Sequence, residues 1–445
     1  MISYDQALQR VVESVSPLKP RETSLHEASG LILAKPAKAL WQMPRSDNSA
    51  MDGFAINTFP ENFEGGLSIV GASYAGHPFS GQVHPGEAVR ITTGAALPQK
   101  TDTVVPIEET IEKNNKVFLN ESPKQGQHVR YAGEEYRVEE VLVNSGTILK
   151  AGEIALLASA GVEQVCVYPR LRVAVISTGD ELVELGQTPG PGQIVNSNLH
   201  FLRTRLFECG CTPICLGIGA DDQKTLGQLI DQVIDADLII TTGGVSVGEK
   251  DHVQATLQNR NFEKIFWKVA IKPGKPLLFG KLEAKPFFGL PGNPAATAAT
   301  FELFVKPALK RLAGEADVLP EKRIATLTHD VIGGGKRQAF LWCSLQWDKS
   351  EYQVTVSQRQ GSGQNRCLAS KNAILSVPTD VKSLYSGDRV EVLLIEGDSC
   401  LGHSETSFAM ATSKRSQATE LRCNLRHNLL HKRDPQRTRG EDLKA

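Results

Sequence analysis

The feature that most constrains the fold is a change of pattern at Pro169. After this proline, two apolar, strand-like runs at residues 172–178 and 236–242 have helical stretches between them. In one such stretch, apolar residues recur at helical spacing behind Asp222, which is suited to cap a helix. Strands that alternate with helices predict a parallel α/β sheet.

A long helix is expected to close this α/β segment. Asn293 and Pro294 suit its first positions, because the prolyl ring fits the start of a helix. Gly314 suits its end, and Pro307 is expected to kink it.

The chain on either side of this segment has a β pattern. Short alternating runs broken by Gly, Pro, Asn and Asp occur at residues 67–72, 87–92, 117–119 and 141–143. Residues 320–396 return to short β segments, which suits a small barrel or sandwich. The fold class expected is therefore multidomain α/β plus β, with a central α/β domain, β-rich N-terminal domains and a small C-terminal β-barrel.

The length of 445 residues exceeds the roughly 250–300 residues that one hydrophobic core supports, so several domains are expected. Residues 1–168 are assigned to an N-terminal linker and β-rich domains, with a lid inserted at about 46–140 and with residues 1–20 packing on the α/β domain. The α/β domain takes 169–316 and the C-terminal β domain 317–398. Residues 399–445 are polar and basic with few apolar positions, which predicts a disordered tail.

Composition excludes several classes of protein. A formal net charge of −1 offers no general attraction for nucleic acid. No apolar run approaches the length of a membrane span, and the first residues lack the pattern of a signal peptide. The eight cysteines contain no C-x-x-C pair, so neither zinc nor disulfides are expected. These features predict a cytoplasmic protein.

A glycine-rich turn follows the second predicted strand. Gly243, Gly244, Ser246 and Gly248 would let backbone N–H groups and one hydroxyl approach a phosphate, although a tight turn without a ligand has the same pattern. Asp251 follows this turn, and Asp180 and Glu181 follow the first strand. Carboxylates beside a phosphate predict a bridging Mg²⁺, with Glu181 and Asp251 as its ligands, while Asp180 could instead cap a helix.

Two proline-stiffened turns complete the predicted anion site. Lys268, Lys272 and Lys275 lie in a stretch held by Pro273 and Pro276, where rigid lysines suit a phosphate or an oxyanion such as molybdate. Residues 289–294 form a turn, with Pro291 and Pro294, that leads into the predicted long helix. Alternatively, the lysines could simply be solvated surface charge, and the turn at 289–294 could be purely structural.

Six motifs together resemble one family. They read Asp-Asn-Ser-Ala-Met-Asp-Gly-Phe at 47–54, Arg-Ile-Thr-Thr-Gly-Ala at 90–95, Ser-Thr-Gly-Asp-Glu-Leu at 177–182, Thr-Thr-Gly-Gly-Val-Ser-Val-Gly at 241–248, Ile-Lys-Pro-Gly-Lys-Pro at 271–276 and Gly-Leu-Pro-Gly-Asn-Pro at 289–294. In this order they resemble the MoeA/gephyrin E-domain family, the molybdopterin molybdenumtransferases, over residues 1 to about 396. The resemblance implies a homodimer of elongated four-domain subunits, with the active site between the α/β domain of one subunit and the β domain of the other.

The resemblance also implies a reaction and its residues. Adenylated molybdopterin and molybdate enter, the phosphoanhydride is hydrolysed with Mg²⁺ assistance, the pterin's dithiolene captures molybdenum, and AMP leaves. Matched to family positions, Asp52 and Thr93 belong to the β half of the active site. Glu181 and Asp251 match acidic positions of the α/β half, and Asp221 matches a further acidic position. Pro291 and Pro294 match the proline turn of the site. The molybdopterin adenylyltransferase and molybdoenzyme chaperones are the protein partners implied.

The chain departs from the family pattern at two positions. Glu135 stands where many members have aspartate, which puts the reach of that carboxylate in doubt, and Phe54 stands in place of the commoner tyrosine. Two rival functions share the α/β fold. An adenylyltransferase would lack the large β-rich N-terminal half, and a binding scaffold would have no chemical need for Asp52, Glu181 and Asp251.

Overall fold

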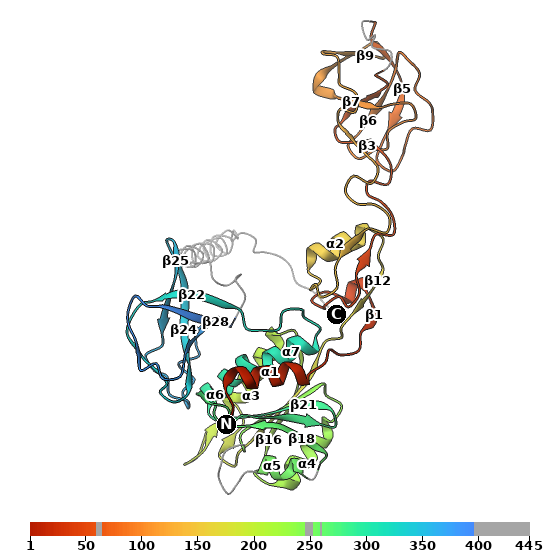
Figure 1. Cartoon of the computed structure of the whole chain (residues 1–445). Helices are drawn as coiled ribbons and strands as arrows, with labels where there is room; N and C mark the ends of the chain where they lie inside the picture. The colour runs from red at the N-terminus through yellow and green to blue at the C-terminus, as the bar shows by residue number, and fades with distance from the viewer. Residues whose placement is uncertain (59–64, 245–251, 259, 396–445) are drawn as a thin grey trace, which may run out of the picture.

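The computed structural model describes residues 1–58, 65–244, 252–258 and 260–395. The chain is elongated, with a small β domain at one end, an α/β domain at the other, and a β-barrel beside the α/β domain (Figure 1). A slender region that contains α2 (Ala151–Ser159), β1 (Arg21–Ser24) and β12 (Gln164–Val167) joins the two ends.

The α/β domain is built on a six-stranded sheet in the order β16-β13-β17-β21-β20-β18. The pairs among the first four strands are parallel, and the last two pairs are antiparallel. Their bounds are Thr212–Gly219 (β16), Arg172–Thr178 (β13), Leu238–Thr242 (β17), Lys285–Leu290 (β21), Leu278–Leu282 (β20) and Phe262–Trp267 (β18). The sheet is thus parallel at its centre and mixed at one edge.

The antiparallel edge has a local cause. Only Glu283 and Ala284 separate β20 from β21, and both have positive φ, at 50° and 69°. A two-residue turn of this kind joins antiparallel neighbours, whereas a parallel pair needs a long crossover.

Helices cover both faces of the sheet (Figure 1). The side chains of α4 and α5 belong to the hydrophobic core on one face, and those of α1, α3, α6, η3 and α7 to the core on the other. Their bounds are Gln223–Gln232 (α4), His252–Gln258 (α5), Tyr4–Ser14 (α1), Ser197–Glu208 (α3), Pro294–Thr300 (α6), Phe301–Val305 (η3) and Lys306–Leu312 (α7). The helix expected behind Asp222 is confirmed as α4, since the Asp222 carboxylate accepts the Thr225 N–H at 2.8 Å.

The long helix expected after Asn293 is present but not uniform. It starts with Pro294 in its first turn, becomes the π-helical turn η3 and resumes as α7, after which Gly314 has a φ of 79°. Pro307 lies just past η3 and has no N–H to donate to the preceding turn. A π-helical turn is one way in which a helix accommodates such a missing hydrogen bond.

The N-terminal β structure has two parts. Near the α/β domain, β1 pairs with β12 and β2 (Ala37–Lys38) with β11 (Val141–Val143), beside η1 (Leu25–Glu27). The distal domain has a six-stranded sheet in the order β7-β4-β6-β5-β9-β8, together with the short pair β3–β10. Its elements are β3 (Asn48–Ser49), β4 (Gly53–Ile56), β5 (Leu67–Ser73), β6 (Glu87–Ile91), β7 (Thr103–Pro106), η2 (Ile107–Glu109), β8 (Thr110–Lys113), β9 (Lys116–Leu119) and β10 (Val129–Arg130).

The C-terminal domain is a closed five-stranded barrel, because β24 pairs with both β25 and β26. The sequence predicted a small barrel or a sandwich, and the structure shows a barrel. One further strand, β19 (Ile271–Lys272), reaches from the α/β domain and pairs with β24. The barrel strands are β22 (Lys322–Leu327), β24 (Gln338–Asp348), β25 (Glu351–Val356), β26 (Ala373–Val377) and β28 (Arg389–Leu394). The same domain contains the short pair β23 (Val331–Ile332) and β27 (Ser383–Leu384). A second short pair, β14 (Leu182–Val183) and β15 (Ile194–Val195), lies in the α/β domain.

Within the described ranges, no helix is long and apolar enough to cross a membrane. The six cysteines of these ranges are all free thiols, and Cys211, Cys343 and Cys367 are buried. The expected tail, 399–445, lies outside the described residues.

Candidate functional site

Three neighbouring parallel strands end at one edge of the α/β sheet, here called the rim. Ser177 of β13 is aligned with Thr242 of β17, and Thr242 is aligned with Leu290 of β21. Each strand is followed by a turn that the sequence singled out, with Gly179, Gly243 and Pro291 as its first residue. Ligands of open α/β sheets bind beyond the carboxyl ends of strands, so the rim is the candidate site.

Gly243 and Gly244 form a turn that a side chain would disrupt. Their φ angles are 96° and 63°, in the region that glycine adopts without strain. A Cβ on Gly243 would lie 2.2 Å from the Thr178 carbonyl oxygen. The β17 turn therefore packs directly on the end of β13.

The proline turn after β21 is held by hydrogen bonds to its carbonyl groups. The Thr297 hydroxyl donates to the Pro291 carbonyl oxygen at 2.6 Å, and the Thr242 hydroxyl donates to the same oxygen at 3.2 Å. The Asn198 amide donates to the Gly292 carbonyl oxygen at 2.7 Å. Sequence reasoning identified Pro291 and Pro294 but missed these three polar residues, because no local pattern marks a threonine or an asparagine as the support of a distant turn.

Backbone N–H groups remain available at the rim. Those of Gly244, Gly292 and Asn293 have no acceptor among the described residues. Gly292 and Asn293 are exposed, and a Cβ on Gly292 would lie 3.6 Å from the Gly243 Cα. Two turns in contact thus present several N–H donors to one place, an arrangement that suits an anion such as a phosphate.

Carboxylates lie at the same rim. The Asp180 side chain accepts the Asp221 N–H at 3.2 Å, so Asp180 links the ends of β13 and β16 rather than capping a helix. The exposed Glu181 folds back over Gly179, since its carboxylate oxygens lie 2.6–2.9 Å from where a Gly179 Cβ would be. The space left by Gly179 therefore sets the position of the Glu181 carboxylate.

These residues fit a hard cation such as Mg²⁺. Mg²⁺ prefers oxygen ligands and is commonly held by one or two carboxylates, substrate phosphates and waters. Within the described residues, no three His, Cys, Asp or Glu side chains form a metal-binding group. Glu181 supplies one carboxylate, while the predicted second ligand, Asp251, lies with Ser246 and Gly248 outside the described residues.

The three predicted lysines lie in the segment between β18 and β20, here called the lysine turn, in which Lys272 belongs to the short strand β19. The Lys268 ammonium lies 3.7 Å from the centre of the Trp267 ring, and Lys272 and Lys275 are exposed. Gly274, between them, packs on Thr300 of α6, and a Cβ there would lie 2.7 Å from the Thr300 methyl group. The lysine turn therefore rests on the helix that the proline turn begins.

A loop of the C-terminal barrel also reaches the rim. The Ser362 carbonyl accepts the Ala295 N–H at 2.9 Å, and the Ser362 hydroxyl accepts from the Asn293 amide at 3.2 Å. The Asn365 amide donates to the Ser197 hydroxyl at the start of α3, at 3.1 Å. This loop was not predicted from the sequence, because it is brought to the rim only by the packing of two domains.

The predicted residues of the distal domain form a separate cluster. The Asp52 carboxylate accepts the Thr93 N–H at 2.7 Å and the Thr93 hydroxyl at 3.0 Å. These bonds lower the pKa of the exposed Asp52 below its usual value, with the backbone N–H as the larger cause. Nearby, Phe54 is buried, and the Arg90 guanidinium lies 5.0 Å from the centre of its ring.

Glu135 lies between the distal domain and the rest of the chain. Its N–H donates to the Met43 carbonyl at 3.0 Å, and its side chain is exposed. The distal domain lies at the opposite end of the molecule from the α/β domain, to which the rim belongs (Figure 1). A single subunit therefore does not bring Asp52 and Thr93 together with Glu181.

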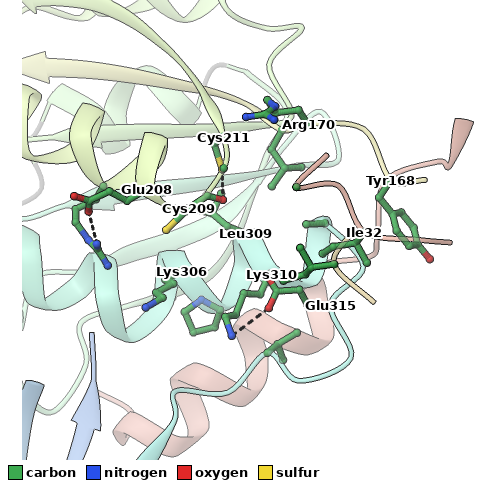
Figure 2. A pocket seen from close by; sticks show the side chains of 18 of the residues that line it. Ile32, Tyr168, Arg170, Glu208, Cys209, Cys211, Lys306, Leu309, Lys310 and Glu315 are labelled. Atoms are coloured by element: carbon green, nitrogen blue, oxygen red, sulfur yellow. Dashed lines mark hydrogen bonds and ion pairs between the residues drawn. The ribbon is translucent and has the colours of Figure 1, made fainter. Parts of the chain in front are cut away.

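The structure also contains a cavity of about 700 Å³ (Figure 2). Its lining includes Arg170, just before β13, and Cys211, just before β16, so it opens at the amino-terminal edge of the sheet. Of the described residues that the sequence predicted for the site, none lines it. The candidate site is therefore the rim and not this cavity.

The fold and the rim define a class: a multidomain α/β protein with an anion site at the ends of its parallel strands. Comparison with known proteins identifies the family. Residues 2–161 match the MoeA N-terminal region (domain I and II), 174–311 a probable molybdopterin binding domain, and 325–395 the MoeA C-terminal region (domain IV). The chain belongs to the MoeA family.

Relatives agree with this membership. The chain is 39% identical over 380 residues to a molybdopterin molybdenumtransferase of Nostoc sp., covering 83% of this chain and 87% of that protein. It is 31% identical over 403 residues to the protein of the same name from Staphylococcus aureus, covering 89% of this chain and 96% of that protein. A crystal structure of a MoeA protein from Pyrococcus horikoshii covers 89% of this chain and 100% of its own, with 30% identity and a TM-score of 0.77.

Proposed function

We propose that the chain is a molybdopterin molybdenumtransferase that inserts molybdate-derived molybdenum into adenylated molybdopterin and releases AMP. Its two relatives of that name, which it matches over most of their length, support the assignment. The observation that carries it is the rim, where N–H groups of two contacting turns lie beside the carboxylates of Asp180 and Glu181. A phosphoanhydride needs both kinds of group, donors for its oxygens and carboxylates for its counter-ion.

The residues of the rim act on the phosphates of the substrate. The N–H groups of Gly244, Gly292 and Asn293 bind and orient the phosphoanhydride, and the lysine turn attracts the molybdate oxyanion. Glu181, with Asp251, would hold Mg²⁺, which neutralises phosphate charge during hydrolysis. AMP then leaves, and the two dithiolene sulfurs of the pterin hold the molybdenum.

The proposal includes a homodimer in which the site is shared. Asp52 and Thr93 flank strands of the distal domain, and Glu181 follows β13 in the α/β domain at the other end of the molecule. They therefore contribute to the same site only if they come from different copies of the chain. Asp221 and Glu135 are assigned as further acidic residues of that shared site. We further propose that the enzyme is cytoplasmic and that it receives its substrate from the adenylyltransferase and delivers product to molybdoenzyme chaperones.

The test uses purified protein, adenylated molybdopterin and Mg²⁺, with and without molybdate. Molybdate-dependent release of AMP is expected from the wild type, together with a loss of about 100-fold or more in Glu181→Ala if Glu181 holds the metal. Glu184→Ala, which removes an exposed carboxylate three residues away, is the matched control and should keep wild-type turnover. Normal turnover in a folded Glu181→Ala variant would reject the site assignment, and wild-type protein without AMP release would reject the function.

A further inference from the structure

We propose that Asn198 is a positioning residue that fixes the orientation of the peptide joining Gly292 to Asn293, so that its N–H faces the phosphate of the substrate. The inference rests on the proposed function, which places that phosphate at the rim. Asn198 lies half-buried in the first turn of α3, and its amide touches the proline turn rather than the outer face of the rim.

The Asn198 amide donates two hydrogen bonds, one to the proline turn and one to the strand beside it. The Nδ2 atom donates to the Gly292 carbonyl oxygen at 2.7 Å and to the Thr242 hydroxyl at 3.0 Å. That hydroxyl in turn donates to the Pro291 carbonyl oxygen at 3.2 Å. One amide therefore links the end of β17 to the turn that follows β21.

Because the peptide unit is planar, fixing a carbonyl group also fixes the direction of the N–H group that follows it. In a planar trans peptide, the C=O and the following N–H point in opposite directions. Because the Gly292 carbonyl points to Asn198, the Asn293 N–H points away from α3. The Pro291 carbonyl, held by Thr297 at 2.6 Å, directs the Gly292 N–H in the same manner. Among the described residues neither N–H has an acceptor, and both residues are exposed.

The prolines of the turn cannot provide this restraint. A proline ring fixes φ at its own position only. Rotation of the peptide between Gly292 and Asn293 changes ψ at Gly292 and φ at Asn293, and neither angle belongs to a proline. Gly292 carries no Cβ to resist the rotation. Without Asn198, the turn could present a carbonyl oxygen, which repels a phosphate, where it now presents a donor.

The test replaces Asn198 by leucine, which has a similar shape and no donors. Asn198→Leu should raise the Kd for AMP and the KM for adenylated molybdopterin by about ten- to a hundredfold, because a charged hydrogen bond is lost. The kcat should change much less, and thermal unfolding should show that the variant is folded. A residue that only supported the fold would lower the active fraction and leave Kd and KM unchanged. Asn198→Ala is measured in parallel in case leucine prevents folding.

The matched control is Asn372→Leu in the barrel, which removes an amide donor to the Leu345 carbonyl at 2.9 Å away from the rim. This control should bind AMP as the wild type does. A folded Asn198→Leu variant with wild-type Kd and KM would overturn the inference. Wild-type protein that binds AMP but releases none from adenylated molybdopterin would reject the proposed function, yet a weaker Kd in Asn198→Leu would still support Asn198's role. Wild-type protein that binds neither AMP nor inorganic phosphate would overturn both.

Discussion

At the residue scale, the site depends on a few side chains whose hydrogen bonds fix a charge or a direction. In the distal domain, two donations from Thr93 favour the ionised form of the exposed Asp52. Since the pKa of Asp52 is lowered by folding, its ionised form stabilises the loop above the usual pKa of aspartate. That stabilisation is lost as the pH falls through the lowered value.

Thr93→Val tests which donor matters. The substitution removes the hydroxyl and keeps the backbone N–H, which is the larger cause of the shift. The pKa of Asp52 should therefore rise only part of the way to its usual value, as measured by NMR titration of the carboxyl carbon. A pKa unchanged from the wild type, or one fully restored to the usual value, would contradict this ranking of the two donors.

The sequence predicted the residues of special conformation better than their partners. Glycines and prolines at strand ends identify turns directly, because few other residues adopt those conformations, so Gly243, Gly244 and Pro291 could be assigned. The hydroxyl and amide groups that hold the turns, such as Thr242 and Asn198, are ordinary residues along the chain. Their role arises only when α3, β17 and β21 are packed together, which no local pattern shows.

At the element scale, strands and helices followed from periodicity, while their pairing at the edges did not. Strand β13 was predicted with its observed bounds, Arg172–Thr178, because a run with four consecutive apolar residues at its centre, lying between Pro169 and Gly179, has few alternatives. The antiparallel β20–β21 hairpin was not predicted, since Glu283-Ala284 is not a typical sequence for its turn.

Helix α3 is joined to η3 by a buried ion pair, in which the Arg205 Nε lies 2.7 Å from the Glu302 carboxylate.

Removal of one member of this pair should destabilise the α/β domain. Glu302→Ala leaves the Arg205 charge without its buried partner, which should cost about 3–5 kcal/mol in urea unfolding. Replacing both residues, by Arg205→Met with Glu302→Leu, should recover most of that loss. The control is Glu139→Ala, which breaks the exposed pair with Lys38 and should cost less than about 1 kcal/mol. Equal losses in the buried and exposed single variants would contradict this account.

At the scale of the whole molecule, the elongated shape separates the two halves of the proposed site. The distal domain with Asp52 and the rim with Glu181 lie at opposite ends of the chain (Figure 1). The kinds of domain, β-rich, α/β and a small β-barrel, were predicted from changes of pattern along the chain, but the arrangement of the domains was not. Only the resemblance to a family suggested that the two halves meet in a dimer.

Mixing two inactive variants tests this sharing. Asp52→Asn and Glu181→Gln should each lack activity when pure. The first substitution damages the half of the site in the distal domain, and the second damages the half at the rim. After subunit exchange, half of the dimers would be mixed, and each mixed dimer would have one intact site, which predicts recovery of about one quarter of wild-type activity. No recovery despite proven exchange would show that both residues act within one subunit.

The most direct test of the central claim is the amount of molybdenum bound by the pterin for each AMP released. Purified wild-type protein would be given adenylated molybdopterin, Mg²⁺ and molybdate, and metal in the pterin fraction would be measured beside AMP. The account predicts equal amounts of the two products, and neither product when Glu181 is replaced by alanine. AMP released without molybdenum in the pterin would show a hydrolase rather than a molybdenumtransferase, and would contradict it.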